Sequence, residues 1–175
     1  MRRLLLLRHA KTERSEPGGR DHERKLDSRG RSDTPKIGAY MARHGYLPQR
    51  ALVSSAVRTQ ETWALLAKAF RPTPAMVSER RLYDAGAQSI LKVIKETPDQ
   101  AATLLVVGHN PGLHELAIIL VASGDIEARE RLREKMPTCA LAVIDFALDG
   151  WDKLHVQSGR LERFITPKLL ETATD

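Results

Sequence analysis

The chain has 175 residues, of which 42% are hydrophobic and 29% are charged. This length suits one domain spanning residues 1–175 that buries about 70% of its unfolded surface, and it leaves no room for a second domain. The single cysteine, Cys139, excludes an internal disulfide and a multi-thiolate metal site, and it fits a reducing compartment. The first apolar run breaks at Arg8, too early for a secretory signal, and no later run approaches a membrane span. We therefore expect a cytoplasmic protein without a membrane partner.

The chain is basic, with a formal net charge of +6 and a sequence pI of about 9.7. Aromatic residues make up only 5% of the sequence, and no basic motif is interleaved with aromatic side chains, so we expect no nucleic-acid partner. Basic residues such as Arg14, Arg20 and Arg24 are instead spread over polar segments. They fit either an anionic substrate or a solvated surface that steers anions.

Strand and helix signals alternate along the chain, which predicts a three-layer α/β/α sandwich with a mostly parallel central sheet. In chain order, the first half predicts a strand at 3–8, a polar loop at 11–28, a helix ending near 43, a strand at 51–54, a helix at 57–70, a strand near 75–78 and a helix between 86 and 98. The second half predicts a strand at 104–107, a helix from 111 to about 122, a charged helix or ordered loop at 127–135, a strand at 140–146 and an edge strand at 151–156.

The ends of some elements carry their own signals. The first helix has two candidate starts, because Ser28 could cap it with a kink at Pro35, or Thr34 could cap it with Pro35 at the first helical position. Ser54-Ser55 can cap the second helix, and Asp149-Gly150 predicts a hairpin turn before the last strand.

Two of the buried-strand runs end in a histidine. Residues 4–7 lead into Arg8-His9, and residues 104–107 lead into Gly108-His109. In open α/β sheets, ligands bind outside the carboxyl ends of the strands. We therefore expect both imidazoles to face one pocket.

Arg58 falls in the first turn of the helix predicted at 57–70. An arginine is poorly placed there for the helix dipole, so it suggests an anion that the guanidinium and the free amides hold together. The alternative is an ordinary ion pair with Glu61 or Glu79.

Two histidines and two arginines, without a cluster of carboxylates or cysteines, predict phosphoryl transfer rather than a metal site. His9 and His109 lack the short spacing and the third ligand typical of a histidine zinc site. In phosphoryl transfer, guanidinium groups hold the phosphoryl oxygens, one neutral imidazole attacks phosphorus, and the other donates to the developing charge. This chemistry requires no cofactor and no metal. His44, His114 and His155 are expected to have structural roles, and Cys139 is expected to lie in the core.

These motifs resemble those of the histidine phosphatase superfamily, whose fold is phosphoglycerate-mutase-like. The resemblance lies in Leu7-Arg8-His9-Ala10, in residues 53–62 and in residues 107–112. Residues 21–26, 82–85, 137–138 and 161–164 are similar to the small SixA-type phosphohistidine phosphatases, which have no large lid insertion. The resemblance therefore covers nearly the whole chain.

The resemblance implies a role for each residue of the predicted pocket. His9 would be the nucleophile that becomes phosphohistidine, Arg8 and Arg58 would clamp the phosphoryl group, and His109 would complete the pocket. Larger members of the superfamily place a carboxylate proton donor after the third strand, and Asp84 matches that position. The other interpretation of Asp84 is a turn or helix-capping aspartate.

The function expected on this basis is a cofactor-independent phosphatase that hydrolyses phosphohistidine on a partner protein through a phosphohistidine enzyme intermediate. The alternatives are a small-molecule phosphomonoesterase of the same superfamily and a non-catalytic module that binds a phospho-ligand. The complete set of Arg8, His9, Arg58 and His109 argues against the non-catalytic module. A phosphoglycerate mutase is not expected, because the chain lacks the longer substrate-binding insertion between the second and third motifs.

Overall fold

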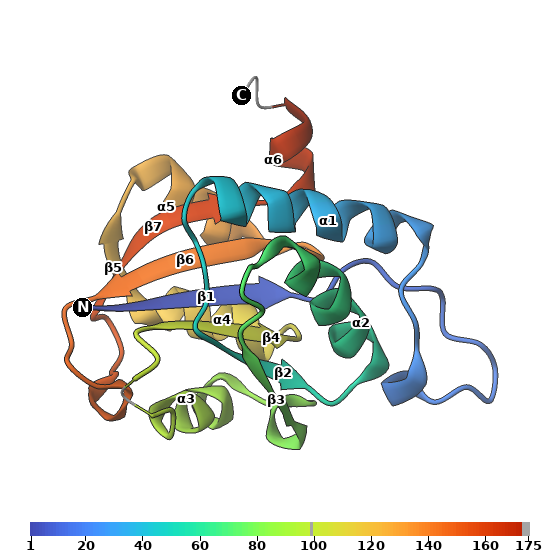
Figure 1. Cartoon of the computed structure of the whole chain (residues 1–175), viewed down its shortest axis with the longest axis horizontal. Helices are drawn as coiled ribbons and strands as arrows, with labels where there is room; N and C mark the ends of the chain where they lie inside the picture. The colour runs from blue at the N-terminus through green and yellow to red at the C-terminus, as the bar shows by residue number, and fades with distance from the viewer. Residues whose placement is uncertain (99, 173–175) are drawn as a thin grey trace.

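The computed structural model describes residues 1–98 and 100–172. Within that part of the chain, one sheet is formed by β1 (Arg2–Arg8), β2 (Arg50–Ser54), β3 (Ala75–Glu79), β4 (Thr103–Gly108), β5 (Val121–Gly124), β6 (Leu141–Phe146) and β7 (Gly159–Ile165) (Figure 1). The α-helices are α1 (Ser28–Arg43), α2 (Val57–Leu66), α3 (Ala87–Lys95), α4 (Gly112–Leu120), α5 (Ile126–Glu134) and α6 (Pro167–Thr172). Short 3-10 helices are η1 (Asp21–Glu23), η2 (Ala67–Ala69), η3 (Arg80–Leu82) and η4 (Trp151–Lys153). None of the described helices is long and apolar enough to cross a membrane.

The strand order in the sheet is β3-β2-β4-β1-β6-β7-β5. The first four strands of this order are parallel, β6 runs antiparallel to β1 and β7, and β5 is parallel to β7. The predicted α/β fold with a mostly parallel central sheet is thus confirmed. The register of β1 and β4 pairs Leu7 with Val107 and Arg8 with Gly108, so the residues that follow these strands emerge side by side.

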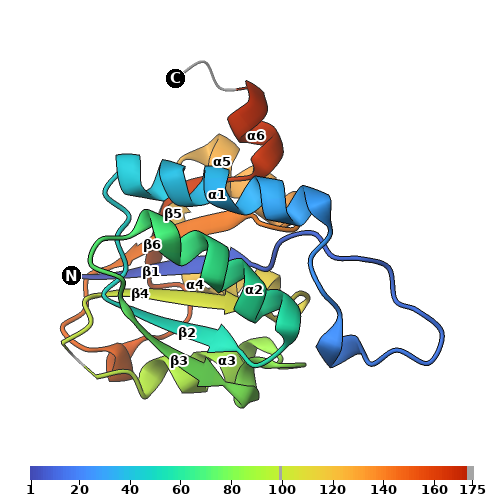
Figure 2. The ribbon, with the colours of Figure 1, turned by 45° about the vertical axis from the view of Figure 1, so that its right-hand side comes forward.

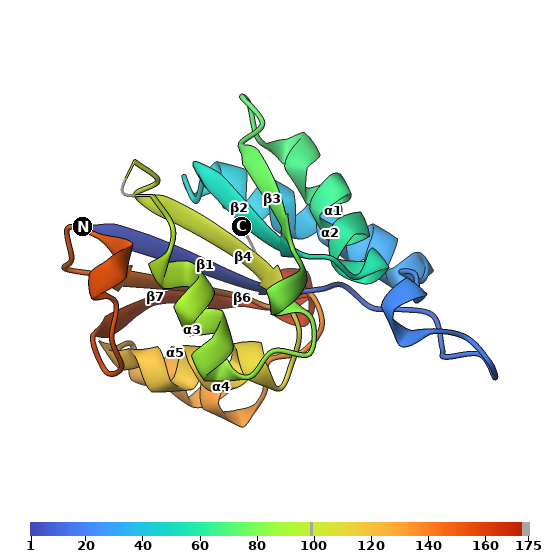
Figure 3. The same cartoon turned by 90° about the horizontal axis from the view of Figure 1, so that it is seen from below.

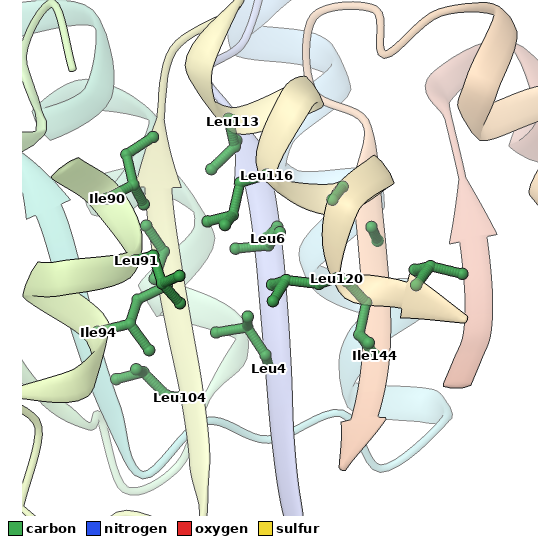
Figure 4. Close-up of a cluster of buried hydrophobic side chains, with 14 of the residues drawn as sticks. Leu4, Leu6, Ile90, Leu91, Ile94, Leu104, Leu113, Leu116, Leu120 and Ile144 are labelled. Carbon is green, nitrogen blue, oxygen red and sulfur yellow. The ribbon is translucent and has the colours of Figure 1, made fainter. Parts of the chain in front are cut away.

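Helices cover both faces of the sheet. α1 and α2 pack on one face, and α3, α4 and α5 pack on the other (Figure 3). α6 packs on the same face as α1. Successive side chains of β1 alternate between the two faces: Leu4 and Leu6 join one core, Leu5 and Leu7 the other. Figure 4 shows Leu4 and Leu6 beneath the inward leucines of α4. Burial on both faces explains why β1 is a continuous apolar run rather than an alternating one.

The start of α1 differs from both predicted starts. Asp27 is the N-cap, and its side chain accepts a hydrogen bond from Gly30 N at 2.8 Å. Ser28 is already helical, and Pro35 lies inside the helix. The hydroxyl of Thr34 donates to Gly30 O, so it does not cap. The carboxylate one residue before Ser28 is the acceptor within reach of the free amides of the first turn.

The predicted serine cap of α2 is also wrong. Its N-cap is Ala56, which makes no side-chain cap hydrogen bond. The hydroxyl of Ser54 lies 2.7 Å from His109 Nε2, and that of Ser55 lies 2.9 Å from His22 Nε2. Both serine hydroxyls therefore contact a histidine ring and do not cap the helix. The helix itself ends at Leu66 and continues as η2.

The edge strand predicted at 151–156 is wrong as well. Trp151 begins the 3-10 helix η4, where its fully buried indole donates to Ala101 O at 2.6 Å. The strand that pairs with β6 is β7, which begins at Gly159. The alternating pattern at 151–156 was misleading because Trp151 and Leu154 enter the core from η4 and its end, whereas Val156 is exposed. The helix predicted to end near 122 stops at Leu120, and the short strand β5 follows it directly.

Candidate active site

His9 and His109 follow the carboxyl ends of the neighbouring strands β1 and β4. Their ring centroids are 5.4 Å apart, and the side chains are only 6% and 8% exposed. The adjacency follows from the parallel register, which is extended by a hydrogen bond from His9 N to Gly108 O. The structure thus brings together the two imidazoles that the sequence assigned to one pocket.

The hydrogen bonding of His9 determines its tautomer. Its Nδ1 lies 2.7 Å from Ala10 O. A carbonyl oxygen only accepts, so Nδ1 carries the proton and Nε2 presents a lone pair. Burial, helped by the charge of Arg8, lowers the pKa of His9 to about 3. At neutral pH the ring is therefore uncharged, which is the state that a nucleophilic imidazole needs.

Arg8 is the last residue of β1 and brings a positive charge to the same place. Its Nη1 donates to Met136 O at 3.2 Å, while its Nε is buried without a hydrogen-bond partner among the described residues. Burial and the charges of Arg58 and Arg24 lower the pKa of Arg8. Three guanidinium groups therefore converge at this end of the sheet, an arrangement that a doubly charged phosphoryl group would stabilise.

Arg58 lies in the first turn of α2, as predicted, and is 5% exposed. It pairs with neither carboxylate that the sequence offered, because Glu61 binds Arg31 and Glu79 binds Arg81. Its partner is Asp21: Nη1 donates to the Asp21 carbonyl at 2.8 Å and Nη2 to the carboxylate at 3.1 Å. The buried Nε of Arg58 has no partner in the described part of the chain.

Asp21, in η1, is a pocket residue that the sequence did not single out. Its carboxylate also accepts hydrogen bonds from Tyr83 Oη at 2.7 Å and from Arg24 Nη2 at 3.1 Å. The Tyr83 hydrogen bond, followed by the charge of Arg58, lowers the pKa of Asp21 to about 2. Asp21 is therefore an ionised group that holds Arg58 and the loop in place, and it has no proton to donate at neutral pH. The signals in the sequence were its position in the polar loop after Arg8-His9 and its place in residues 21–26, which resemble the SixA-type phosphatases.

His109 is held by Ser54, the last residue of β2. Its Nε2 lies 2.7 Å from Ser54 Oγ, and its buried Nδ1 has no partner among the described residues. Ser54 Oγ accepts from Ala56 N at 3.4 Å, and its own proton can go to Nε2; in that tautomer the ring proton is on Nδ1. Burial and the charge of Arg58 lower the pKa of His109 to about 4. The ring is therefore neutral at physiological pH, and in this tautomer its Nδ1–H is a donor.

Asp84 directly follows Tyr83, whose ring centroid lies 5.5 Å from that of His109, but it makes no hydrogen bond or ion pair with the four predicted pocket residues. It is exposed, has a positive φ of 55° in the turn between η3 and α3, and makes no hydrogen bond or ion pair with another described residue. It does not cap α3, whose N-cap is Gly86. The turn interpretation fits these observations, since aspartate tolerates the left-handed conformation.

Several other polar side chains make structural hydrogen bonds. Thr62 Oγ1 accepts from Ala10 N at 3.0 Å and donates to Arg58 O at 2.7 Å, which ties the end of β1 to α2. His114 contacts Leu132 O, and the exposed His155 contacts Lys153 O. Within the described residues, no group of three or more His, Cys, Asp or Glu side chains is arranged to hold a metal ion.

Comparisons with known proteins agree with this geometry. The family model of the histidine phosphatase superfamily (branch 1) matches residues 4–86. Uncharacterized proteins of Mycobacterium tuberculosis and Mycobacterium leprae are 35% and 32% identical, over 93% of this chain and 100% of each relative.

Solved structures extend the match to the whole fold. The protein named as the phosphohistidine phosphatase SixA of Agrobacterium tumefaciens has a TM-score of 0.81 at 28% identity, over 95% of this chain and 98% of that one. The SixA of Nakamurella multipartitia has a TM-score of 0.80 at 27% identity, over 95% and 96%. A sheet with two histidines and two arginines gathered at its strand ends defines the class of protein. The chain belongs to the histidine phosphatase superfamily, in its SixA type, and this membership supports a phosphatase.

Proposed function

We propose that this protein hydrolyses phosphohistidine on partner proteins, without a cofactor, through a phosphohistidine formed on His9. The observation that carries the proposal is the environment of His9 Nε2. A neutral imidazole with a free lone pair interacts electrostatically with Arg8, Arg58 and His109, and the buried Arg8 Nε, Arg58 Nε and His109 Nδ1 have no partner among the described residues. Unpaired buried donors are costly, so such a set favours an anionic ligand between them.

The proposed reaction has two displacements at phosphorus. In the first, His9 Nε2 bonds to phosphorus while the bond to the substrate imidazole breaks, and that electron pair returns to the leaving nitrogen. The His9 ring becomes positively charged, and its Nδ1–H bond to Ala10 O strengthens. Arg8, Arg58 and His109 stabilise the charge on the equatorial oxygens. In the second, water attacks phosphorus, the electron pair returns to Nε2, and inorganic phosphate leaves while one water proton passes to solvent.

The carboxylates near the pocket favour a substrate with a P–N bond. Asp21 is ionised at neutral pH, and Asp84 is exposed and unconnected to the four pocket residues among the described contacts. An alkoxide leaving group needs a proton late in P–O cleavage. A phosphorylated imidazole with a proton on its other nitrogen leaves as a neutral ring and needs no such acid. The cytoplasm is the proposed site of action, and the single buried Cys139 fits it.

The proposal is tested by comparing turnover of a phosphohistidine protein with turnover of sugar, nucleotide and lipid phosphates. We expect the phosphohistidine protein to give the highest kcat/KM. Brief incubation with labelled substrate should leave an acid-labile, alkali-stable phosphoryl group on the protein, and this label should be absent from His9→Ala.

His155→Ala is the matched control, because His155 is an exposed histidine remote in sequence from the motifs. A label that persists in His9→Ala would contradict the proposed nucleophile. A small phosphate ester with a higher kcat/KM than any phosphohistidine protein would favour the phosphomonoesterase instead.

A further inference from the structure

A cavity lies at the same edge of the sheet as the strand ends that lead into His9 and His109. Its volume is about 550 Å³, and its walls come from α1, the end of α5, the segment after α5 and the β7–α6 junction. Figure 2 shows α6 standing beside α1 with α5 behind it. We call it the basic cavity, for the charges that line it.

Positive charge dominates the lining. Among the residues that the structure describes, five cationic side chains and two carboxylates line the cavity. One of the carboxylates, Asp33, forms an ion pair with Arg29 at 3.3 Å. The remaining cations make no ion pair with a described carboxylate; they are Lys11, Arg131, Lys135 and Lys168. Positive charge gathered in a concave surface raises the local concentration of anionic ligands.

The basic cavity lies close to the phosphoryl pocket. Lys11 follows His9 by two residues, so their Cα atoms are within about 7.6 Å. Lys135 precedes Met136, whose carbonyl accepts hydrogen bonds from Arg8 Nη1 at 3.2 Å and Asn110 Nδ2 at 2.8 Å. A ligand in the basic cavity would therefore lie next to a phosphoryl group bound at His9.

The register of the sheet also places the basic cavity near the end of β1. Leu7 of β1 pairs with Leu141 of β6, and Leu141 pairs with Ile165 of β7. Adjacent strands are about 4.8 Å apart, so the end of β7 lies about 10 Å from the end of β1. Thr166 and Pro167, which follow Ile165, line the cavity.

Size and composition indicate the kind of ligand. The volume falls within the range of about 300–1,000 Å³ for sites that enclose a whole ligand, well beyond the needs of one phosphoryl group. The lining also contains apolar side chains, including Phe164 and Leu169. A lining with both cationic and apolar side chains suits the carboxylates and the aliphatic stems of glutamate and aspartate.

We propose that the basic cavity binds an acidic segment of the partner protein, next to the phosphohistidine that enters the pocket. The inference rests on the proposed function for the identity of the phosphorylated partner. It adds a specificity determinant: phosphohistidine sites flanked by aspartate and glutamate would be the preferred substrates.

The test compares two phosphohistidine peptides of equal length, one with Asp and Glu flanks and one with Asn and Gln flanks. The cavity variant is Lys135→Gln/Lys168→Gln. The control variant is Lys92→Gln/Lys95→Gln, which removes two exposed lysines of α3 that do not line the cavity and changes the net charge equally. We expect the cavity variant to lower kcat/KM for the acidic peptide about three- to tenfold, the scale of two partly exposed charge pairs. The difference should shrink at high salt.

For the cavity variant, kcat/KM on the neutral peptide and on p-nitrophenyl phosphate should stay near the wild-type value. For the control variant, kcat/KM should stay near the wild-type value on every substrate. Equal losses on both peptides, or the same loss in the control variant, would overturn the inference. Thermal unfolding of both variants verifies that they remain folded.

A binding measurement separates this inference from the proposed function. Fluorescence anisotropy with an unphosphorylated acidic peptide requires no turnover. Binding to the wild-type protein that weakens only in the cavity variant would support the basic cavity even if no phosphohistidine peptide were hydrolysed. A single-stranded oligonucleotide that binds more tightly than the acidic peptide, and loses its affinity in the cavity variant, would overturn the assignment to an acidic peptide.

Discussion

Asp21 holds Arg58 from two sides, with its carbonyl 2.8 Å from Nη1 and its carboxylate 3.1 Å from Nη2. The loop between β1 and α1 thereby fixes the guanidinium that α2 contributes to the pocket. Tyr83 donates to the same carboxylate, so three separate segments meet at one side chain.

Removal of the Asp21 carboxylate should therefore misplace Arg58. We expect Asp21→Ala to lower kcat about tenfold, since a hydrogen bond to a charged group contributes about 1.5 kcal/mol or more. Steady-state kinetics on p-nitrophenyl phosphate measure the effect, with the exposed Asp152→Ala as the control. An unchanged kcat would mean that Arg58 is positioned without Asp21.

Two adjacent serines provide a matched pair for His109. Ser54→Ala removes the hydroxyl that contacts His109 Nε2, whereas Ser55→Ala removes one that contacts His22. We expect Ser54→Ala to lower kcat about tenfold with little change in KM, and to alter the tautomer of His109 in the ¹⁵N NMR spectrum. Ser55→Ala should leave the His109 tautomer unchanged. Similar spectra for wild type and Ser54→Ala would show that Ser54 does not set the tautomer.

The arginines should act through charge on the phosphoryl oxygens. Truncation of Arg8 or Arg58 to alanine should cost kcat roughly two to three orders of magnitude, the scale for one preorganised donor. Vanadate should inhibit the wild-type protein and bind both variants more weakly. Chelators should leave the wild-type rate unchanged. Activity that EDTA abolishes and a divalent ion restores would point to a metallohydrolase.

The two buried histidines should make stability depend on acidity. The pKa values of His9 and His109 are lowered to about 3 and about 4 in the folded protein, against an unfolded value of 6.5. Above pH 6.5 both states are neutral and the effect is absent. Below it the unfolded chain binds more protons, so stability falls as pH decreases toward the folded values. Each histidine should cost roughly 2 kcal/mol at pH 5 relative to pH 7.5.

Urea unfolding at several pH values measures this dependence. His9→Gln should show a shallower decline between pH 6.5 and 5, while the exposed His155→Gln should follow the wild type. Identical declines in all three proteins would show that His9 is protonated as readily in the folded state as in the unfolded one.

Gly112 provides a test of how closely the pocket segments approach. A Cβ at this position would lie 2.0 Å from Ala85 O, whereas a Cβ at Gly86 would meet nothing within 4 Å. Gly112→Ala should lower the free energy of unfolding by about 1–3 kcal/mol, and Gly86→Ala by less than about 1 kcal/mol. Chemical denaturation of both variants measures these changes in the free energy of unfolding. Equal changes would mean that the segment at Ala85 can move away without loss of stability.

The pocket was predictable where apolar runs position its residues. Arg8 is the last residue of a strand that is buried on both faces, and His9 and His109 each follow such a strand. A strand of this kind can be recognised in the sequence as an unbroken apolar run. Arg58 was placed correctly because the pattern of residues 57–70 predicted the helix whose first turn contains it. The fold class followed from the alternation of these runs with amphipathic helices.

Asp21 and Ser54 were beyond the reach of this reasoning. Asp21 lies in an irregular loop, and its partner Arg58 is 37 residues away, so no local pattern links them. Ser54 satisfied the rule for a helix cap, and only the tertiary position of His109 decides where its hydroxyl goes. The strand β5 was missed because Val121 continues the apolar pattern of α4 without a break.

The alternation of β1 between two cores has a consequence for changes in chain length. Leu4 and Leu6 belong to one core and Leu5 and Leu7 to the other, and the same alternation continues to Arg8 and His9. Insertion of one residue into β1 would exchange the two faces and turn the imidazole of His9 away from His109. Insertion of two residues would restore the sides but move His9 farther from the end of the sheet and out of register with His109. The length of β1, and whether it is odd or even, thus constrain both cores and the proposed nucleophile together, so natural variation in chain length is expected in the loops and not in residues 2–9.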